Sequence, residues 1–336
     1  MRLITRDDAK ILIVRPDRIG DVVLSTPVFT SIRRARPGWK ISALVTPVVA
    51  PLLEGHPDVD EVIRLSTSEK PSYSNTVGLA EEIKAGRFDA AVHLFSSFWT
   101  SLAVWRAGVP LVLGPASKMA SIFYNVRITQ HRSRGGRHEA DHNLDLLAPL
   151  DIPPVRKSSV AVREGFAPPP GLLASAKKNI GVFPGMGGSA RNWKPASYAR
   201  LADILAGEGM NVILICGPGG EPLLSEVGAS AKTAHSKFVC LGLNDLASFI
   251  RMLDCFVAPS TGPLHIASAV GTPAVGIYCP IRVCLPERWG PIGERDAALR
   301  PDVPVCERCE PERCEHYDCM DRLEPERVAD AVRERA

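Results

Sequence analysis

Residues 10–45, KILIVRPDRIGDVVLSTPVFTSIRRARPGWKISALV, decide the fold of this chain. The apolar runs at 10–14 and 40–45 have the length of buried parallel strands. Between them, residues 21–38 carry apolar side chains at helical spacing, basic residues near the end and a closing Pro-Gly, which predicts a helix. Asp21 lies at the mouth of the first predicted strand, and an ionised carboxylate is costly where apolar residues gather unless something pairs with it or uses it.

The same alternation of strand and helix continues along the chain. Further apolar runs are expected to form strands at 61–65, 90–95, 110–114, 179–185, 211–217, 237–242, 255–260 and 273–278. Residues 166–178 include three successive prolines and a glycine, and we interpret them as an interdomain linker. The expected fold class is α/β, with two Rossmann-like domains, 1–165 and 179–336, facing each other across a cleft.

Composition narrows the function classes. The chain has 336 residues, 45% of them hydrophobic and 23% charged, which suits a soluble two-domain protein. No apolar run has the length of a membrane span, and the first residues do not resemble a signal peptide, so we expect a cytoplasmic location. A net charge of +3 is too small to indicate nucleic-acid binding.

Glycine spacing excludes two common nucleotide-binding classes. The loop after the first strand, RPDRIGD, has one glycine where G-x-G-x-x-G is required, and GPGGEP at 217–222 ends in proline. The chain also lacks G-x-x-x-x-G-K-[ST]. Neither a nicotinamide site nor a P-loop is predicted.

The richest candidate site follows the strand predicted at 179–185. The sequence FPGMGGSARNWKP places a glycine-rich turn and two cations before Pro195, which suits the first turn of a helix. Backbone amides, a helix N-terminus and cations together favour an anion such as a diphosphate. The alternative is a glycine loop that only turns the chain, with surface cations beside it. The candidate anion-binding residues are Gly187, Gly188, Ser189, Arg191 and Lys194.

Two other strand ends in the second half carry polar residues. Glu221 follows LICGPGG and could accept hydrogen bonds from ribose hydroxyls, or it could only favour the start of the next helix. In PSTGPLHIASAVGTP, Ser260, Thr261 and Gly262 lie where a helix begins, and such a position suits a phosphate or a sugar. His265 lies one turn into that helix and is a secondary candidate.

All nine cysteines lie at or after Cys216. Five are in or beside apolar segments, where a free thiol behaves as a small buried hydrophobic group. The other four have C-x2-C-x4-C-x4-C spacing, and we interpret them as reduced thiols that hold the tail, with a structural zinc site as the alternative. They are Cys306, Cys309, Cys314 and Cys319.

Four motifs in this order resemble glycosyltransferase family 9, the ADP-heptose:lipopolysaccharide heptosyltransferases. They are ILIVRPDRIGDVVLSTPVF, PGMGGSARNWKPASYARLA, PSTGPLHIASAVGTPAVGIY and CERCEPERCEHYDCMDRLEPERV. The resemblance spans nearly the whole chain. It implies a GT-B fold, with the acceptor on the N-terminal domain and the nucleotide sugar on the C-terminal domain. It also implies inverting transfer with no catalytic metal and no cofactor besides the nucleotide-sugar substrate.

The resemblance assigns roles to the candidates. Asp21 matches the family's catalytic base, with helix capping as the alternative role. Arg191 takes the place of the family's phosphate-binding Lys, which keeps the charge and changes its geometry, and Lys194 is the second candidate. Glu221 matches the ribose-contacting Glu, and residues 260–265 match the loop that contacts sugar and phosphate.

The acceptor is expected to be an anionic lipid-linked glycan at the inner face of the cytoplasmic membrane, such as inner-core lipopolysaccharide. The basic stretch around 127–138 could contact it, although a solvated basic loop is the alternative. The acceptor-binding candidates are Arg18, Arg132, Arg134 and Arg137. The protein is expected to act as a monomer.

One departure from the family leaves the donor open. Many members have D-[ST]-G where this chain has Ser260-Thr261-Gly262, and a neutral hydroxyl discriminates between sugar hydroxyls less strongly than a carboxylate. Alternatives to heptosyl transfer are therefore transfer of another nucleotide sugar to a different glycan, and a non-catalytic GT-B binding protein. A nucleotide-sugar epimerase of similar shape is a third and weaker alternative.

Overall fold

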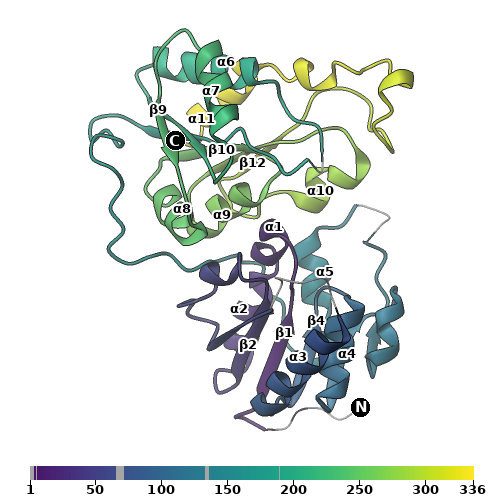
Figure 1. The fold of residues 1–336 in the computed structure, drawn as a ribbon. Helices are drawn as coiled ribbons and strands as arrows, with labels where there is room; N and C mark the ends of the chain where they lie inside the picture. The colour runs from purple at the N-terminus through teal and green to yellow at the C-terminus, as the bar shows by residue number, and fades with distance from the viewer. Residues whose placement is uncertain (1–3, 5, 66–71, 133–135, 189) are drawn as a thin grey trace. The chain divides into compact units, whose positions relative to one another are not determined.

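The computed structural model describes residues 4, 6–65, 72–132, 136–188 and 190–336. It divides into two compact units, 1–161 and 162–336, and each carries one parallel sheet (Figure 1). The short apolar runs form parallel sheets because the strands of a parallel sheet are buried on both faces and therefore need apolar side chains on both. The α/β class with two Rossmann-like units is confirmed. Within the described ranges, no helix is long and apolar enough to cross a membrane.

The first unit has the strand order β3-β2-β1-β4-β5-β6. β1 lies at the centre, where it pairs with β2 on one side and β4 on the other, with Ile11 opposite both Ile41 and Ala90. The chain order therefore reverses at β1, and ligands of open α/β sheets bind at the carboxyl ends next to such a point. The strands are β1 (Lys10–Val14), β2 (Lys40–Val45), β3 (Glu61–Arg64), β4 (Ala90–His93), β5 (Leu111–Pro115) and β6 (Val126–Ile128).

Helices cover both faces of this sheet. On one face, α3 and α4 pack on strand residues such as Leu12 and Val14, while α2 and α5 contact each other elsewhere in the unit. Leu12 and Val14 are fully buried, and each contributes about 1.5–3 kcal/mol by leaving water. The helices and 3-10 turns are α1 (Ile19–Val23), α2 (Thr26–Ala35), η1 (Ala50–Leu52), α3 (Tyr73–Gly86), α4 (Phe98–Arg106), η2 (Met119–Phe123), α5 (Glu139–Asp145) and η4 (Ala148–Leu150).

The single helix predicted over 21–38 is wrong, because the structure divides it into α1 and α2. Pro27 has no N–H to donate to the carbonyl of Val23, and a helix interior is broken at such a position. The hydroxyls take over locally: Thr26 Oγ1 donates to Val23 O at 2.8 Å, and Ser25 Oγ donates to Asp21 O at 2.7 Å. The break leaves α1 as a short turn that holds Asp21 at the end of β1.

The second unit repeats the topology with the order β12-β11-β10-β7-β8-β9. Here β7 is the central strand, and it pairs with β10 and β8, with Val182 opposite Val257 and Leu214. The strands are β7 (Asn179–Val182), β8 (Asn211–Cys216), β9 (Ser236–Val239), β10 (Cys255–Pro259), β11 (Ala274–Ile277) and β12 (Ala297–Leu299).

Two prolines and one glycine mark helix boundaries in the second unit, and the start predicted at Pro195 is confirmed. α6 begins at Pro195, and α9 has Pro263 in its first turn. α9 ends at Val270, and its C-cap is Gly271, whose φ of +88° favours glycine at a helix C-terminus. The helices are α6 (Pro195–Gly207), α7 (Glu221–Ser230), α8 (Leu243–Ile250), α9 (Gly262–Val270), η5 (Arg282–Cys284), α10 (Pro286–Trp289), η6 (Pro311–Arg313), η7 (Cys319–Arg322) and α11 (Pro325–Arg333).

The C-terminal tail returns to the start of this unit. α11 packs on α6, and the two lie side by side in Figure 1. Trp193 is buried just before α6, and its Nε1 donates to Leu323 O at 3.0 Å. The tail is therefore attached to the turn that follows β7.

Candidate functional site

Asp21 lies in the short helix that follows the central strand of the first unit. Its Oδ1 accepts a hydrogen bond from Arg15 Nη2 at 2.6 Å, and its side chain is mostly buried. Arg18, rather than Asp21, occupies the N-cap of α1, and no side chain caps this helix. The capping role considered for Asp21 is therefore wrong.

Arg15 holds this part of the sheet edge together, and the sequence analysis did not identify it. Its side chain is only 2% exposed, and Nη1 donates to Leu94 O at 3.0 Å at the end of the neighbouring strand β4. The same guanidinium lies 3.5 Å from Asp17 and 3.4 Å from Glu139. The available sequence signal was a cation directly after the apolar residues of the first strand, since a buried charge requires partners.

Glu139 and Asn143 come from α5 and complete the network. Glu139 is buried, and its Oε1 lies 2.5 Å from Arg132 Nη1 as well as near Arg15. Asn143 Oδ1 accepts from both arginines at 3.3 Å, while its amide nitrogen donates to Ser25 Oγ at 3.0 Å. Two guanidinium groups thus neutralise much of the charge of three carboxylates beside α1.

The electrostatic environment makes Asp21 a stronger base than an exposed aspartate. Burial raises the pKa of Asp21 above its ordinary value, the Arg15 guanidinium opposes that shift, and the carboxylates of Asp17 and Glu139 add to it. A carboxylate with a raised pKa accepts a proton more readily near neutral pH. The arrangement is therefore suited to general-base chemistry at the carboxyl end of β1.

The predicted acceptor-binding cations differ in their exposure and in their ion pairs. Arg18 is exposed beside Asp21, whereas Arg132 is bound within the Glu139 network. Arg137 lies 2.6 Å from Asp145, in a half-exposed ion pair. Arg134 lies outside the described residues.

In the second unit, an asparagine shapes the predicted anion-binding turn. Asn192 Nδ2 donates to Pro184 O at 2.8 Å, and its Oδ1 accepts from Trp193 N at 2.8 Å and Tyr198 Oη at 2.6 Å. Gly188 has a φ of +73°, a conformation that favours glycine. A Cβ added at Gly187 would meet no described atom within 4 Å, so this part of the turn is open. Ser189 lies outside the described residues.

The two cations of this turn contact the C-terminal tail. The Arg191 guanidinium stacks on Tyr317 at 4.1 Å and its Nη1 lies 3.5 Å from Cys309 Sγ. Lys194 Nζ lies 2.5 Å from Asp321 Oδ2. A pocket of about 190 Å³ is lined by both cations together with Asn192, Tyr317 and Asp321. The turn and the tail therefore come together, although the paired residues are 118 and 127 positions apart in the chain.

The remaining donor-side candidates lie at the same sheet edge. β7 is flanked by β10 and β8, so the turn lies between Ser260 at the end of β10 and Glu221 after β8. Glu221 is exposed as the first residue of α7. Thr261 is the N-cap of α9 and Gly262 is its first residue, while His265 is buried within that helix.

The four tail cysteines differ in exposure: Cys319 is buried, Cys309 is exposed, and Cys306 and Cys314 are intermediate. Within the described part of the chain, no group of three or more His, Cys, Asp or Glu residues is arranged to hold a metal ion.

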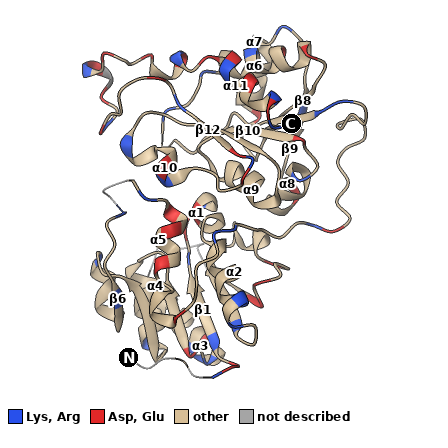
Figure 2. Ribbon diagram, turned by 180° about the vertical axis from the view of Figure 1, so that it is seen from behind, with Lys and Arg blue, Asp and Glu red and all other residues tan. Residues whose placement is uncertain are grey.

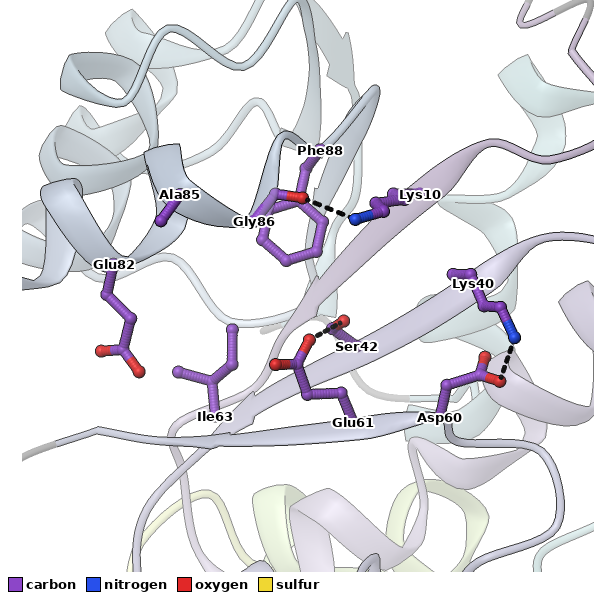
Figure 3. Close-up of a pocket in the computed structure, with 10 residues that line it drawn as sticks. All are labelled: Lys10, Lys40, Ser42, Asp60, Glu61, Ile63, Glu82, Ala85, Gly86 and Phe88. Atoms are coloured by element: carbon purple, nitrogen blue, oxygen red, sulfur yellow. Dashed lines mark hydrogen bonds and ion pairs between the residues drawn. The ribbon is translucent and has the colours of Figure 1, made fainter.

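A larger pocket, of about 610 Å³, lies at the opposite edge of the first sheet (Figure 3). Lys10, Lys40 and Glu61, the first residues of β1, β2 and β3, contribute to it. Several of its polar groups are paired locally, such as Lys40 with Asp60 at 3.5 Å and Ser42 with Glu61 at 2.8 Å. None of the predicted site residues lines it, and ligands of such sheets bind at the carboxyl edge.

Two Rossmann-like units in one chain, with polar residues at the carboxyl end of each central strand, match the two-domain architecture of the GT-B class. The structure of a glycosyltransferase family 9 protein from Veillonella parvula superimposes with a TM-score of 0.84 at 20% identity, covering 99% of this chain and 98% of that one. E. coli ADP-heptose lps heptosyltransferase II gives a TM-score of 0.78 at 23% identity, covering 97% and 98%.

Comparison of the sequence with known proteins shows which family the chain belongs to. The model of glycosyltransferase family 9 (heptosyltransferase) matches residues 76–317. A Haemophilus influenzae protein named "Putative glycosyltransferase" is 36% identical over 306 residues, which are 85% of this chain and 87% of that protein. This chain belongs to glycosyltransferase family 9, and it is a glycosyltransferase.

Proposed function

We propose that this enzyme transfers heptose from ADP-heptose to an inner-core lipopolysaccharide acceptor with inversion at the anomeric carbon. The observation that carries the proposal is the buried Asp21–Arg15 pair at the end of β1, in a chain that belongs to the heptosyltransferase family. The name of the E. coli structure that shares the fold supports this choice of donor and acceptor.

Asp21 is the proposed general base. Inverting transfer needs one base to take the proton of the acceptor hydroxyl as that oxygen attacks the anomeric carbon, while the nucleoside diphosphate leaves from the opposite side. Asp21 is suited to this role because burial raises its pKa. Arg15 positions the carboxylate through its 2.6 Å contact and is a positioning residue.

The turn before α6 is the proposed site for the diphosphate. Arg191 would bind it as a planar donor, and the open backbone around Gly187 and Gly188, with the N-terminus of α6 nearby, would add further donors. Charge that develops on the leaving diphosphate is stabilised by fixed donors of this kind. Lys194 contributes less, because Asp321 already neutralises it. Ser189 belongs to the same proposed site by its sequence position.

Ribose and sugar contacts are proposed for the two neighbouring strand ends. Exposed Glu221 would accept hydrogen bonds from the ribose hydroxyls. Ser260, Thr261 and Gly262 would contact the sugar and phosphate at the start of α9, with buried His265 behind them.

The acceptor is proposed to bind the first unit as an anionic lipid-linked glycan at the inner membrane face. Exposed Arg18 is the candidate nearest to Asp21 in the sequence, and Arg137 is half-exposed. Arg132 would act through the Glu139 network, and Arg134 is proposed from its sequence position. The enzyme is proposed to act as a monomer that needs no catalytic metal and no cofactor beyond the donor.

Ser260 is the observation that favours a second candidate, transfer of another nucleotide sugar to a different cell-surface glycan. A hydroxyl replaces the carboxylate found at this position in many family members, so the enzyme would discriminate less between sugar hydroxyls.

The test measures donor binding by calorimetry and heptose transfer to truncated lipopolysaccharide. We expect Asp21→Asn to bind ADP-heptose like the wild type and to lose transfer by roughly 100-fold or more. Asp17→Asn is the matched control, because Asp17 also contacts Arg15 at 3.5 Å, and it should lose much less transfer activity.

Transfer by Asp21→Asn within tenfold of the wild type would contradict the role of Asp21. A wild type that binds no ADP-sugar would favour the second candidate, and one that binds without transfer would indicate a non-catalytic protein.

A further inference from the structure

The outer surface of α4 and η2 exposes large apolar side chains. Trp105 is 59% exposed, Met119 is 74% exposed and Ile122 is 61% exposed, while Phe98 is also partly exposed. Single exposed apolar residues are ordinary on protein surfaces, but contiguous groups indicate an interaction site. We define Phe98, Trp105, Met119, Ile122 and Phe123 as the aromatic patch.

Ring contacts join Phe98, Trp105 and Phe123, and Met119 and Ile122 lie on the same 3-10 turn as Phe123. Phe123 lies between the other two rings, with centroid distances of 5.4 Å to Phe98 and 5.9 Å to Trp105. Trp99 packs on Phe98 at 5.6 Å with perpendicular rings. Because α4 and η2 are held by these contacts, the patch is formed before any partner arrives.

The stretch of chain that carries the aromatic patch has charge of one sign. The sequence contains no acidic residue between Asp89 and Glu139. Within that interval, Arg106, Lys118 and Arg127 are exposed, on α4, just before η2 and on β6. Figure 2 shows basic positions at β6, with acidic positions beginning at α5. Exposed Trp and Phe beside Lys and Arg are the combination that proteins use at the boundary between anionic headgroups and acyl chains.

We propose that the aromatic patch and its flanking cations form a surface that docks the first unit on an anionic lipid bilayer. Trp105, Met119 and Ile122 would enter the headgroup boundary, while Arg106 and Lys118 would remain at the level of the lipid phosphates. The binding is peripheral and reversible, since a few side chains bury far less apolar area than a spanning helix. This surface goes beyond the proposed function, and it does not depend on which sugar is transferred.

The test is flotation of the full chain with vesicles that contain phosphatidylglycerol, compared with vesicles of phosphatidylcholine alone. We expect the wild type to bind the anionic vesicles and to dissociate as salt is raised. Trp105→Ser/Ile122→Ser should lower vesicle binding about tenfold or more. Arg106→Gln/Lys118→Gln should lower it by roughly tenfold to thirtyfold, since each surface cation adds about fivefold at an anionic membrane. Met252→Ser is the matched control, an exposed apolar residue of the second unit, and it should bind like the wild type.

Three results would overturn the proposal. They are a wild type that does not bind anionic vesicles, patch variants that bind like the wild type, and sedimentation showing that the patch instead joins two copies of the chain. Transfer to a deacylated, water-soluble acceptor separates this proposal from the proposed function. The patch variants should retain that transfer, because the change affects only docking, whereas Asp21→Asn should lose it.

Discussion

Arg15 Nη2 and Asp21 Oδ1 lie 2.6 Å apart, at the end of the central strand of the first sheet. The pair balances two opposing effects on one carboxylate. Burial and the nearby carboxylates raise the pKa of Asp21, while the guanidinium limits that rise. Arg15 also donates hydrogen bonds to Asn143, Glu139 and the carbonyl of Leu94. The position of the Asp21 carboxylate therefore depends on contacts that Arg15 makes with residues up to 128 positions away in the chain.

Arg15→Met should move the acid limb of the kcat/KM profile to higher pH. Without the guanidinium, burial and the carboxylates act unopposed on the pKa of Asp21, and a protonated Asp21 cannot act as the base. We expect kcat/KM on the acid limb to fall about tenfold or more. Because Arg15→Met also leaves Glu139 less well paired, Arg15→Lys serves as the conservative variant and should shift the limb less. An acid limb that does not move in either variant would contradict the positioning role.

Asp21→Asn should raise the thermal stability at neutral pH. The folded pKa of Asp21 lies above its unfolded value, so the folded state binds the proton more tightly, and the wild type loses stability as pH rises through the folded pKa. The amide of the variant remains neutral throughout this range. The Tm of the variant should therefore exceed that of the wild type by a few degrees at neutral pH, and the difference should shrink as pH falls below the folded pKa, as calorimetry can measure. A lower Tm for Asp21→Asn at neutral pH would mean that the ion pair with Arg15 outweighs burial.

Arg191→Gln should weaken ADP binding more than Lys194→Gln. Arg191 has no carboxylate within 4 Å among the described residues, whereas Lys194 is paired with Asp321 at 2.5 Å. We expect the Kd for ADP to rise about tenfold for Arg191→Gln, as for a charge-assisted hydrogen bond, and less than about threefold for Lys194→Gln. Asp321→Asn is the informative control, because releasing Lys194 should lower the Kd. Equal effects of the two cation variants in calorimetry would show that Asp321 does not neutralise Lys194.

Arg137→Gln should affect acceptor binding, whereas Arg132→Gln should affect the stability of the fold. Arg137 lies in a half-exposed pair with Asp145, so its loss should raise the acceptor KM about threefold and leave Tm nearly unchanged. Arg132 neutralises Glu139, whose side chain is only 2% exposed, so its loss should lower Tm by several degrees. Steady-state kinetics with varied acceptor, together with thermal unfolding, measure both effects. An unchanged acceptor KM in Arg137→Gln and in Arg134→Gln would remove this stretch from the acceptor site.

The sequence alone determined the class of the fold and the location of the candidate site. Apolar runs of four to six residues favour buried strands, because burial of their side chains is favourable whatever the partner strand. Local signals also placed Asp21 after a strand and Pro195 at the start of a helix. The strands β6 and β12 were missed, since each has only three residues that are half-buried or exposed and their hydrophobic signal is weak.

Tertiary structure alone decided the partners of the charged groups. Nothing near Arg15 in the sequence indicates Glu139, 124 residues later, and nothing near Arg191 or Lys194 indicates Tyr317 or Asp321. Hydrophobic burial depends on the amount of apolar surface and can be inferred from local composition. An ion pair depends on the distance between two particular atoms, and only the packing of α5 beside β1, and of the tail against the turn before α6, sets those distances.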